Sequence, residues 1–258
     1  MCGKTKEEHD KNLKTFLNAV EEYNLTLNEN KCVYASETIN LVGYRMSKGI
    51  LQPDPGRVKP VLDMPVPCNA KELRRMLGMF SNYAKWIPRY SEKIKPLVVL
   101  KKFHLNDEAL HALTTLKTDL SSATLGVIDE DLPLTLETDT SDNAIPATLN
   151  QQGDRPVAFF SRMLNKRELH YSRVEKEALA IIEVVWKWAH FLTGSHFTVV
   201  TDQRSVSSMY SGENRGKIKN DEVLQWHMEL NEFDFDIVHR SGKLNSAADA
   251  LSRVYCVL

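Results

Sequence analysis

The chain has 258 residues, of which 42% are hydrophobic and 26% charged, and its formal net charge is −1. This length suffices for one large core or two smaller ones, of which we expect two, and the composition is that of a globular protein. No apolar run approaches the roughly 20 residues of a membrane span, and the first ten residues lack the apolar region of a secretory signal. We therefore expect no membrane contact and an intracellular, cytoplasmic or nuclear location. The four cysteines are too scattered for a zinc knuckle or a CxxC pair and are interpreted as reduced thiols.

Charge is distributed unevenly along the chain. Lys and Arg outnumber Asp and Glu by 19 to 16 in residues 1–130 and are outnumbered by 14 to 18 in residues 131–258. An acidic half beside a mildly basic half is typical of a metal site next to a surface that binds a phosphate backbone, although differences of this size also arise by chance.

The first elements predicted along the chain are a helix and short β segments. Apolar residues recur at helical spacing over residues 6–23, and two β segments follow at 31–34 and 39–46. Residues 53–56, rich in proline and glycine, predict a turn.

A second helix, over about residues 70–86, is amphipathic. Its expected N-cap is Asn69, with Glu72 as the capping partner. Basic side chains outside its apolar stripe could follow a phosphate backbone, or they could form an ordinary solvated face. The candidate nucleic-acid contacts on this helix are Lys71, Arg74, Arg75, Lys85 and Arg89.

A leucine-rich helix over residues 106–120 leads into a polar stretch at 121–131, which we interpret as a linker. The predicted domains are therefore residues 1–120 and 132–258.

The second half predicts strands first and then strands that alternate with helices, which indicates a mixed sheet covered by helices. A long helix carries Val174, Ala178, Ile181, Val185 and Ala189 on its apolar face. The other expected elements are strands at 134–139, 144–150, 156–161, a strand ending at 202, helices at 205–210 and 220–233, a strand at 235–239 and a helix at 245–254.

Four carboxylates of this half stand where a core residue or a strand end is expected. Asp139 and Asp202 each end an apolar strand, Glu177 interrupts the apolar face of the long helix, and Asp249 sits in a helix of small residues. Buried acids cost stability unless a cation or a partner compensates them. Taken singly, each has an ordinary interpretation as a turn, cap or ion-pair residue. Taken together, they predict a divalent-metal site.

Several motifs resemble one known family in the family's order. The second half is similar to the ribonuclease H domain of a Ty3/gypsy-type retrotransposon polyprotein, through LETDTSD (136–142), VEKEALAII (174–182), VTDQRS (200–205) and AADALSR (247–253). The first half resembles the end of the reverse transcriptase just upstream, through INLVGYRMSKGILQPDPGRV (39–58) and ELRRMLGMFSNYAKWIPRYSEKIKPL (72–97).

The resemblance implies an α/β fold: a ribonuclease H-like five-stranded mixed sheet with flanking helices, preceded by a smaller, mainly helical α+β thumb-like domain. It implies an endonuclease that cleaves the RNA strand of an RNA:DNA hybrid with two Mg²⁺ ions, which Mn²⁺ can replace. Asp139 would bridge both ions, Glu177 and Asp202 would complete one side, and Asp249 would hold the second ion. Other parts of the retroelement polyprotein are further expected partners.

Further candidate residues surround this quartet. In related ribonucleases H a histidine at the spacing of His239 from the last aspartate helps proton or product movement, and a non-catalytic histidine at a strand end is an equally good interpretation. The strand-end position of Asn143, Gln203 and Gly153 suits contacts to the hybrid, whose 2′-hydroxyls distinguish RNA from DNA. The basic loop with Arg215, Lys217 and Lys219 could grip the DNA backbone or be solvated.

Two features depart from the family pattern. Pro146 replaces a small residue in an expected strand and removes a ladder donor, which a bulge could absorb. No Tyr-x-Asp-Asp motif occurs, so we expect no DNA synthesis by this polypeptide. The alternatives to a hybrid nuclease are a catalytically inactive retroelement remnant that binds nucleic acid or protein, and another enzyme of the same fold, such as a transposase or a Holliday-junction resolvase.

Overall fold

The computed structural model describes residues 5–28, 30, 32–34, 36–100, 103–152, 155–210 and 220–240, without the side chains of Ser208 and Met209. The chain divides into two compact units, Met1–Ile39 and Asn40–Leu258. The first unit consists mainly of α1 (Lys6–Glu22), whose N-cap Thr5 accepts a hydrogen bond from the backbone N–H of Glu8. The predicted first helix is thus confirmed to within one residue. The β segment predicted at 31–34 is wrong, because residues 32–34 form no strand.

Short antiparallel strands open the second unit. β1 (Thr38–Leu41) spans the boundary between the units, and β2 (Tyr44–Ser47) forms a hairpin with β3 (Ile50–Pro53). Lys48 and Gly49 at its turn both have positive φ, as a two-residue hairpin turn of the favoured handedness requires. β3 also pairs with β4 (Leu125–Gly126), which lies within the predicted linker. The division into domains at 121–131 stays a prediction.

The helices that follow enclose a core of their own, in which Met76, Phe80, Ile87 and Leu116 are almost fully buried. The predicted helix over 70–86 ends early, at Ser81, and a short 3-10 turn replaces its last residues. No helix in the part of the chain that the structure describes is long and apolar enough to cross a bilayer. The elements are α2 (Pro55–Leu62), α3 (Ala70–Ser81), η2 (Ala84–Trp86), α4 (Tyr90–Val98) and α5 (Asp107–Ser121).

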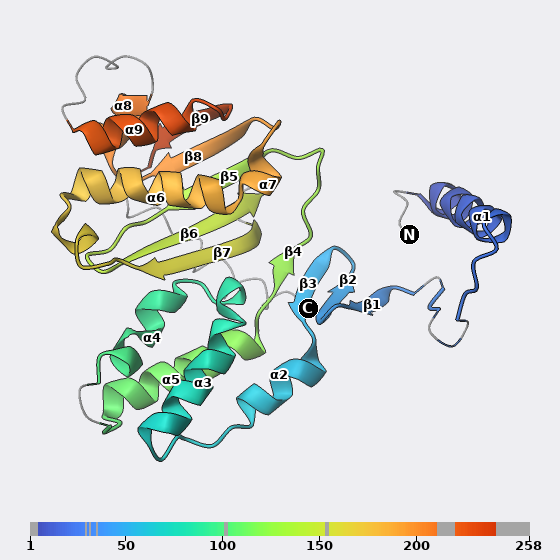
Figure 1. The fold of residues 1–258 in the computed structure, drawn as a ribbon, viewed down its shortest axis with the longest axis horizontal. Coiled ribbons are helices and arrows are strands. Elements are labelled where there is room, and N and C mark those ends of the chain that lie inside the picture. The colour runs from blue at the N-terminus through green and yellow to red at the C-terminus, as the bar shows by residue number, and fades with distance from the viewer. Residues whose placement is uncertain are drawn as a thin grey trace, which may run out of the picture. The chain divides into compact units, whose positions relative to one another are not determined.

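A five-stranded mixed sheet dominates the rest of the unit (Figure 1). The central strand β5 is antiparallel to β6 and parallel to β8, and β8 is parallel to β9. The predicted α/β fold class is confirmed. In sheet order the strands are β7 (Arg155–Met163), β6 (Ala144–Gln151), β5 (Leu134–Thr138), β8 (Phe197–Thr201) and β9 (Phe235–His239).

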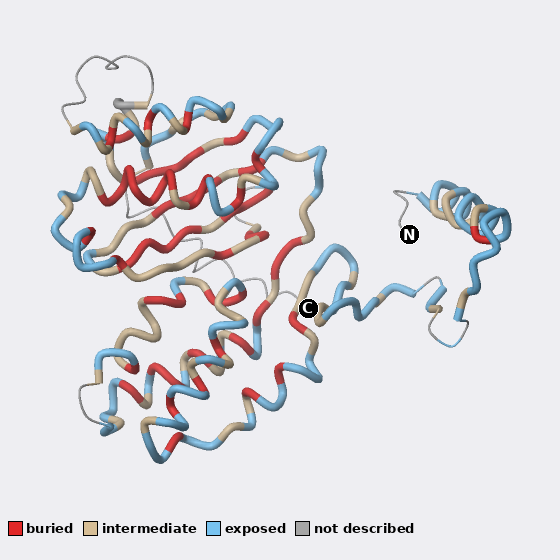
Figure 2. Tube along the Cα trace, in the orientation of Figure 1, coloured by how far each residue is buried: buried red, intermediate tan, exposed pale blue. Residues whose placement is uncertain are grey.

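Helices cover this sheet and complete its core. α6 (Arg173–Lys187) packs on β5 and β6 and has α9 (Asp221–Leu230) beside it (Figure 1). Buried residues concentrate in the central strands and along α6, as Figure 2 shows, because alternate strand residues such as Leu134 and Leu136 face the apolar side of this helix. The remaining elements are η3 (Glu168–His170), α7 (Ala189–Leu192) and α8 (Arg204–Tyr210).

Pro146 lies within β6, opposite Asp139 at the end of the β5–β6 ladder. Its carbonyl accepts a hydrogen bond from the backbone N–H of Asp139 at 3.3 Å, one step beyond the last register pair, Thr138 with Ala147. A residue with a backbone N–H at position 146 would therefore have added only the last hydrogen bond between β5 and β6. The register irregularity of β6 lies elsewhere, between Leu149 and Asn150. The position at the ladder's end, rather than a bulge, accommodates the proline.

Candidate metal centre

Two of the predicted carboxylates meet at one edge of the sheet. Asp139 follows β5 and Asp202 follows β8, and the parallel register that pairs Glu137 with Val200 brings the two strand ends to neighbouring positions. The side chain of Asp139 is 42% exposed, whereas that of Asp202 is 12% exposed. The carboxyl ends of the parallel strands thus place one accessible and one largely buried acid side by side.

Glu177 approaches the same edge from α6. Its side chain is fully buried, and its Oε1 accepts hydrogen bonds from the backbone N–H of Thr140, at 3.1 Å, and from the Thr140 hydroxyl. The hydroxyl of Thr201, at the end of β8, donates to Oε2 at 3.4 Å. Burial raises the pKa of the Glu177 carboxyl to about 7; the Thr140 bonds oppose this shift, and the negative charges of Asp202 and Asp139 add to it.

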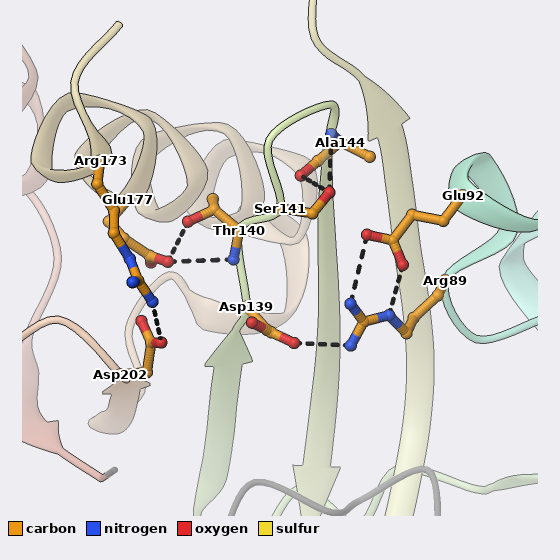
Figure 3. Close-up of polar contacts among 9 residues, drawn as sticks. All are labelled: Arg89, Glu92, Asp139, Thr140, Ser141, Ala144, Arg173, Glu177 and Asp202. Atoms are coloured by element: carbon orange, nitrogen blue, oxygen red, sulfur yellow. Dashed lines mark hydrogen bonds and ion pairs between the residues drawn. The ribbon is translucent and has the colours of Figure 1, made fainter. Parts of the chain in front are cut away.

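Arginines hold the two aspartates, as Figure 3 shows. Arg89 Nη1 lies 2.7 Å from Asp139 Oδ2, and Arg173 Nη2 lies 2.8 Å from Asp202 Oδ2. Arg173 comes from the first turn of α6, four residues before Glu177, whereas Arg89 precedes α4, 50 residues before Asp139 in the sequence. Asp139 and Asp202 therefore each have an arginine as a cationic partner.

The donor set suits a hard divalent cation. Asp139, Glu177 and Asp202 offer only carboxylate oxygens, the ligands that Mg²⁺ prefers. Asp202 Oδ1 is buried and has no hydrogen-bond partner among the described residues, which leaves an acceptor that a cation would satisfy. Within that part of the chain, however, no three Asp, Glu, His or Cys side chains are close enough to hold one ion. The types of donor atom that these residues offer fit a divalent cation, while the three carboxylates are spaced too widely in this structure to share one ion.

Several predicted site residues lie outside the residues that the structure describes. They are Asp249, the fourth expected ligand, Gly153, and the basic loop residues Arg215, Lys217 and Lys219. Their roles stay predictions.

His239, Asn143 and Gln203 lie at the same end of the sheet. The ring Nε2 of the exposed His239 is 3.2 Å from the backbone carbonyl of Asp202, to which it donates when it carries the proton. Asn143 precedes β6, and its backbone carbonyl accepts a hydrogen bond from the backbone N–H of Leu164. The backbone N–H of Gln203 donates to the Thr201 hydroxyl. These contacts place His239 and Gln203 beside the end of β8 and Asp202, and the side-chain roles of all three residues stay predictions.

The basic residues on and after α3 are exposed. Lys71, Arg74 and Arg75 project from the helix, and Lys85 bonds to the Tyr44 hydroxyl and lies over that ring. Arg89 is turned toward Glu92 and Asp139. Nucleic-acid contact by these five residues stays a prediction.

Sequence reasoning missed the partners of the carboxylates. The spacing of Arg173 and Glu177, four residues apart, places both on one face of α6 and so signals an arginine near the site, although its partner in the structure is Asp202. Glu137, on β5, is buried and accepts a hydrogen bond from Arg240 Nη1 at 2.9 Å. Successive residues of a strand point to opposite faces of the sheet, so Glu137 lies on the face opposite Leu136. This alternation is the sequence pattern that could have indicated the position of Glu137.

Comparisons with known proteins agree with this architecture. Residues 129–233 match the RNase H-like domain found in reverse transcriptase. The chain is 33% identical over 253 residues to the retrovirus-related Pol polyprotein from transposon 297 of Drosophila melanogaster, covering 96% of this chain and 23% of the polyprotein. It is 34% identical over 263 residues to the transposon Tf2-3 polyprotein of Schizosaccharomyces pombe, covering 98% of this chain and 20% of that one. The chain thus spans about a fifth of the length of these curated relatives.

A solved structure shares the fold. The foamy viral protease-reverse transcriptase in complex with an RNA/DNA hybrid superposes with a TM-score of 0.76 at 19% identity, covering 96% of this chain and 35% of the viral one. The same viral protein in complex with double-stranded DNA gives a TM-score of 0.75 at 18% identity, covering 94% of this chain and 53% of that one. These matches support a Ty3/gypsy-type retrotransposon polyprotein, in the stretch that carries the RNase H-like domain found in reverse transcriptase.

Proposed function

We propose that this chain is a divalent-metal-dependent endonuclease that hydrolyses the RNA strand of an RNA:DNA hybrid. The observation that carries the proposal is that Asp139, Glu177 and Asp202 lie at the same end of the sheet, inside the matched domain. A buried glutamate and a buried, unpartnered aspartate oxygen are costly in a protein without a cation to bind. A metal-binding role explains why such groups lie at the same end of the sheet.

Asp139, Glu177 and Asp202 would hold Mg²⁺ together with Asp249, and Mn²⁺ would substitute for it. When bound, two such ions would provide an activated water and stabilisation of the departing 3′ oxygen. Thr140 fixes the position of Glu177 through two hydrogen bonds to Oε1, which leaves Oε2 directed toward the Thr201 side. Because Glu177 must be deprotonated to act as a ligand and its pKa is about 7, metal binding near neutral pH should release protons.

The partner is an RNA:DNA hybrid. The foamy viral relative in fold is known with such a hybrid, and the accessible Asp139 gives a phosphodiester backbone a route to the carboxylates. Discrimination between RNA and DNA would come from 2′-hydroxyl contacts at the strand ends, near Asn143 and Gln203.

The decisive experiment is cleavage of a hybrid labelled on either strand, with and without Mg²⁺. We expect cuts in the RNA strand only, in the presence of Mg²⁺ or Mn²⁺, and none with a chelator. The variant Asp139→Asn should lose this cleavage, and Asp142→Asn, three residues on and outside the quartet, should keep it. Cleavage that survives the chelator, or that Asp139→Asn retains in full, would rule out the assignment.

A second prediction concerns the basic face near α3. Replacing Arg74, Arg75 and Lys85 together with glutamine should weaken hybrid binding and reduce the slope of log affinity against log salt by roughly two to three, since each phosphate contact releases about one counterion. Titrations of the parent and the triple variant at several salt concentrations provide the measurement. An unchanged slope would mean that this face is only solvated.

The second candidate function is a non-catalytic binding module, and the arginine partners of Asp139 and Asp202 favour it. In that case the same assays would show hybrid binding without cleavage and no response of the affinity to Mg²⁺.

A further inference from the structure

Arg89 reaches the carboxylates from outside the matched domain. It is the N-cap residue of α4 and adopts a left-handed backbone conformation, with φ 54° and ψ 35°. A residue other than glycine rarely takes this conformation unless surrounding contacts hold it there. The backbone at Arg89 therefore points to side-chain contacts strong enough to keep it in place.

Those contacts use three nitrogens of the guanidinium. Nε lies 2.5 Å from Glu92 Oε2 and Nη2 lies 3.3 Å from Glu92 Oε1, while Nη1 binds Asp139 Oδ2 at 2.7 Å (Figure 3). Although burial acts to raise it, hydrogen bonds from Arg89 and Ser141 hold the pKa of Glu92 below its ordinary value. Glu92 is thus a charged carboxylate that orients the guanidinium through Nε and Nη2, and Nη1 is directed toward Asp139.

A guanidinium and a divalent cation compete for the same carboxylate oxygen. Arg89 Nη1 donates a charge-assisted hydrogen bond to Asp139 Oδ2 at 2.7 Å, so a metal ion that used this oxygen would have to share it with the guanidinium or replace it. We propose that Arg89 is a positioning residue that occupies Asp139 in the metal-free protein and is displaced when a divalent cation binds, so that Arg89 sets the metal affinity of the site. This inference rests on the proposed function, because it takes Asp139 as a metal ligand.

Displacement of Arg89 need not detach α4 from the sheet. The backbone N–H of Ser91 donates to the hydroxyl of Ser161 on β7 at 3.0 Å, and both Ser91 and Tyr90 are buried. The start of α4 is therefore held on β7 by contacts that do not involve Arg89. Removal of the guanidinium should change the metal site and leave the packing of α4 in place.

The test is calorimetric titration of the whole chain with Mn²⁺ or Mg²⁺ in the absence of nucleic acid. Arg89→Gln removes the charge, and glutamine disfavours the left-handed backbone conformation as much as arginine does. We expect its metal Kd to be about two- to fivefold lower than that of the parent, the scale of a half-exposed ion pair. Arg89→Gly, which adopts this backbone without strain, should give the same change and secures the test if Arg89→Gln folds poorly.

The matched control is Lys93→Gln. Lys93 lies on the same helix and pairs with Asp119 at 2.7 Å, an acid outside the candidate site, so its loss removes the same charge at a similar place. Its metal Kd should equal that of the parent. An unchanged or raised Kd in both Arg89 variants, or an equal decrease in Lys93→Gln, would overturn the role of Arg89 and leave the proposed function standing. Absence of metal binding by the parent and by both Arg89 variants would overturn the proposed function as well.

Discussion

Replacing Glu177 with glutamine should reduce cleavage of the hybrid's RNA strand by more than about 100-fold while the protein stays folded. Loss of a residue that only supports a metal ligand costs roughly 10- to 100-fold, so loss of a ligand should cost more. Glutamine keeps the size of the side chain, and its carbonyl can accept the two Thr140 hydrogen bonds that Glu177 Oε1 accepts now. Its amide can donate to the Thr201 hydroxyl. The change removes the negative charge and little else.

Glu175→Gln provides the control for this variant. Glu175 lies two residues earlier on α6 and forms a capping box with Ser172, which glutamine can also form. We therefore expect Glu175→Gln to cleave at nearly the parental rate. Rates should be measured under single-turnover conditions at saturating Mg²⁺, with circular dichroism to confirm folding. Parental cleavage by Glu177→Gln would exclude Glu177 as a ligand, and an equal loss in both variants would point to damage to α6 instead.

The sheet and its central carboxylates followed closely from the sequence. Strands alternate with helices in the second half, and the apolar runs before Asp139 and Asp202 predicted β5 and β8 to within one residue. The apolar spacing of α6 placed Glu177 on the buried face, where the structure has it. These features depend on local periodicity, which a single sequence records.

The first half was harder to predict, because its local signals conflict with its tertiary structure. α2 and α4 each contain an interior proline, Pro60 and Pro96, which counts against a helix when only the sequence is read. The segment predicted as one strand at 39–46 is interrupted by Val42 and Gly43, both with positive φ, and glycine alone gave a signal for this break. Packing against neighbouring elements decides these cases.

The ion pairs of the candidate site were beyond prediction for a different reason. Arg89 and Asp139 are 50 residues apart, and their contact depends on how α4 packs against β6 and β7. No periodicity or motif spacing encodes such a contact. The positions of Asp139 and Asp202 at strand ends could therefore be predicted from the sequence, whereas their ion pairs with Arg89 and Arg173 could not.

The metal-free protein should lose stability as the pH rises from about 4.5 to about 7, because of Glu177. Its carboxyl has a pKa of about 7 in the folded protein and an ordinary value of 4.5 when exposed, so the folded state binds the proton more tightly. The stabilisation is fully present below pH 4.5, falls as the pH rises through 7, and is absent above that. A difference of this size corresponds to about 3 kcal/mol in the free energy of unfolding.

The measurement is urea unfolding at pH values from 4.5 to 8.5 with a chelator present, for the parent and for Glu177→Gln. The pKa values of Glu92 and Glu168 are lowered in the folded protein, so both residues stabilise the fold at pH values above their ordinary pKa and lose this effect only at lower pH. Their contribution is the same in the parent and in Glu177→Gln. The difference between the two proteins therefore isolates Glu177: the variant should be the more stable above pH 7, and its advantage should disappear toward pH 4.5. Mg²⁺ at pH 8 should reverse the order, since a cation stabilises only the protein whose Glu177 is a carboxylate. Parallel stability curves for the parent and Glu177→Gln would show that the buried carboxyl titrates normally and that this edge of the sheet lacks the crowded negative charge a metal site requires.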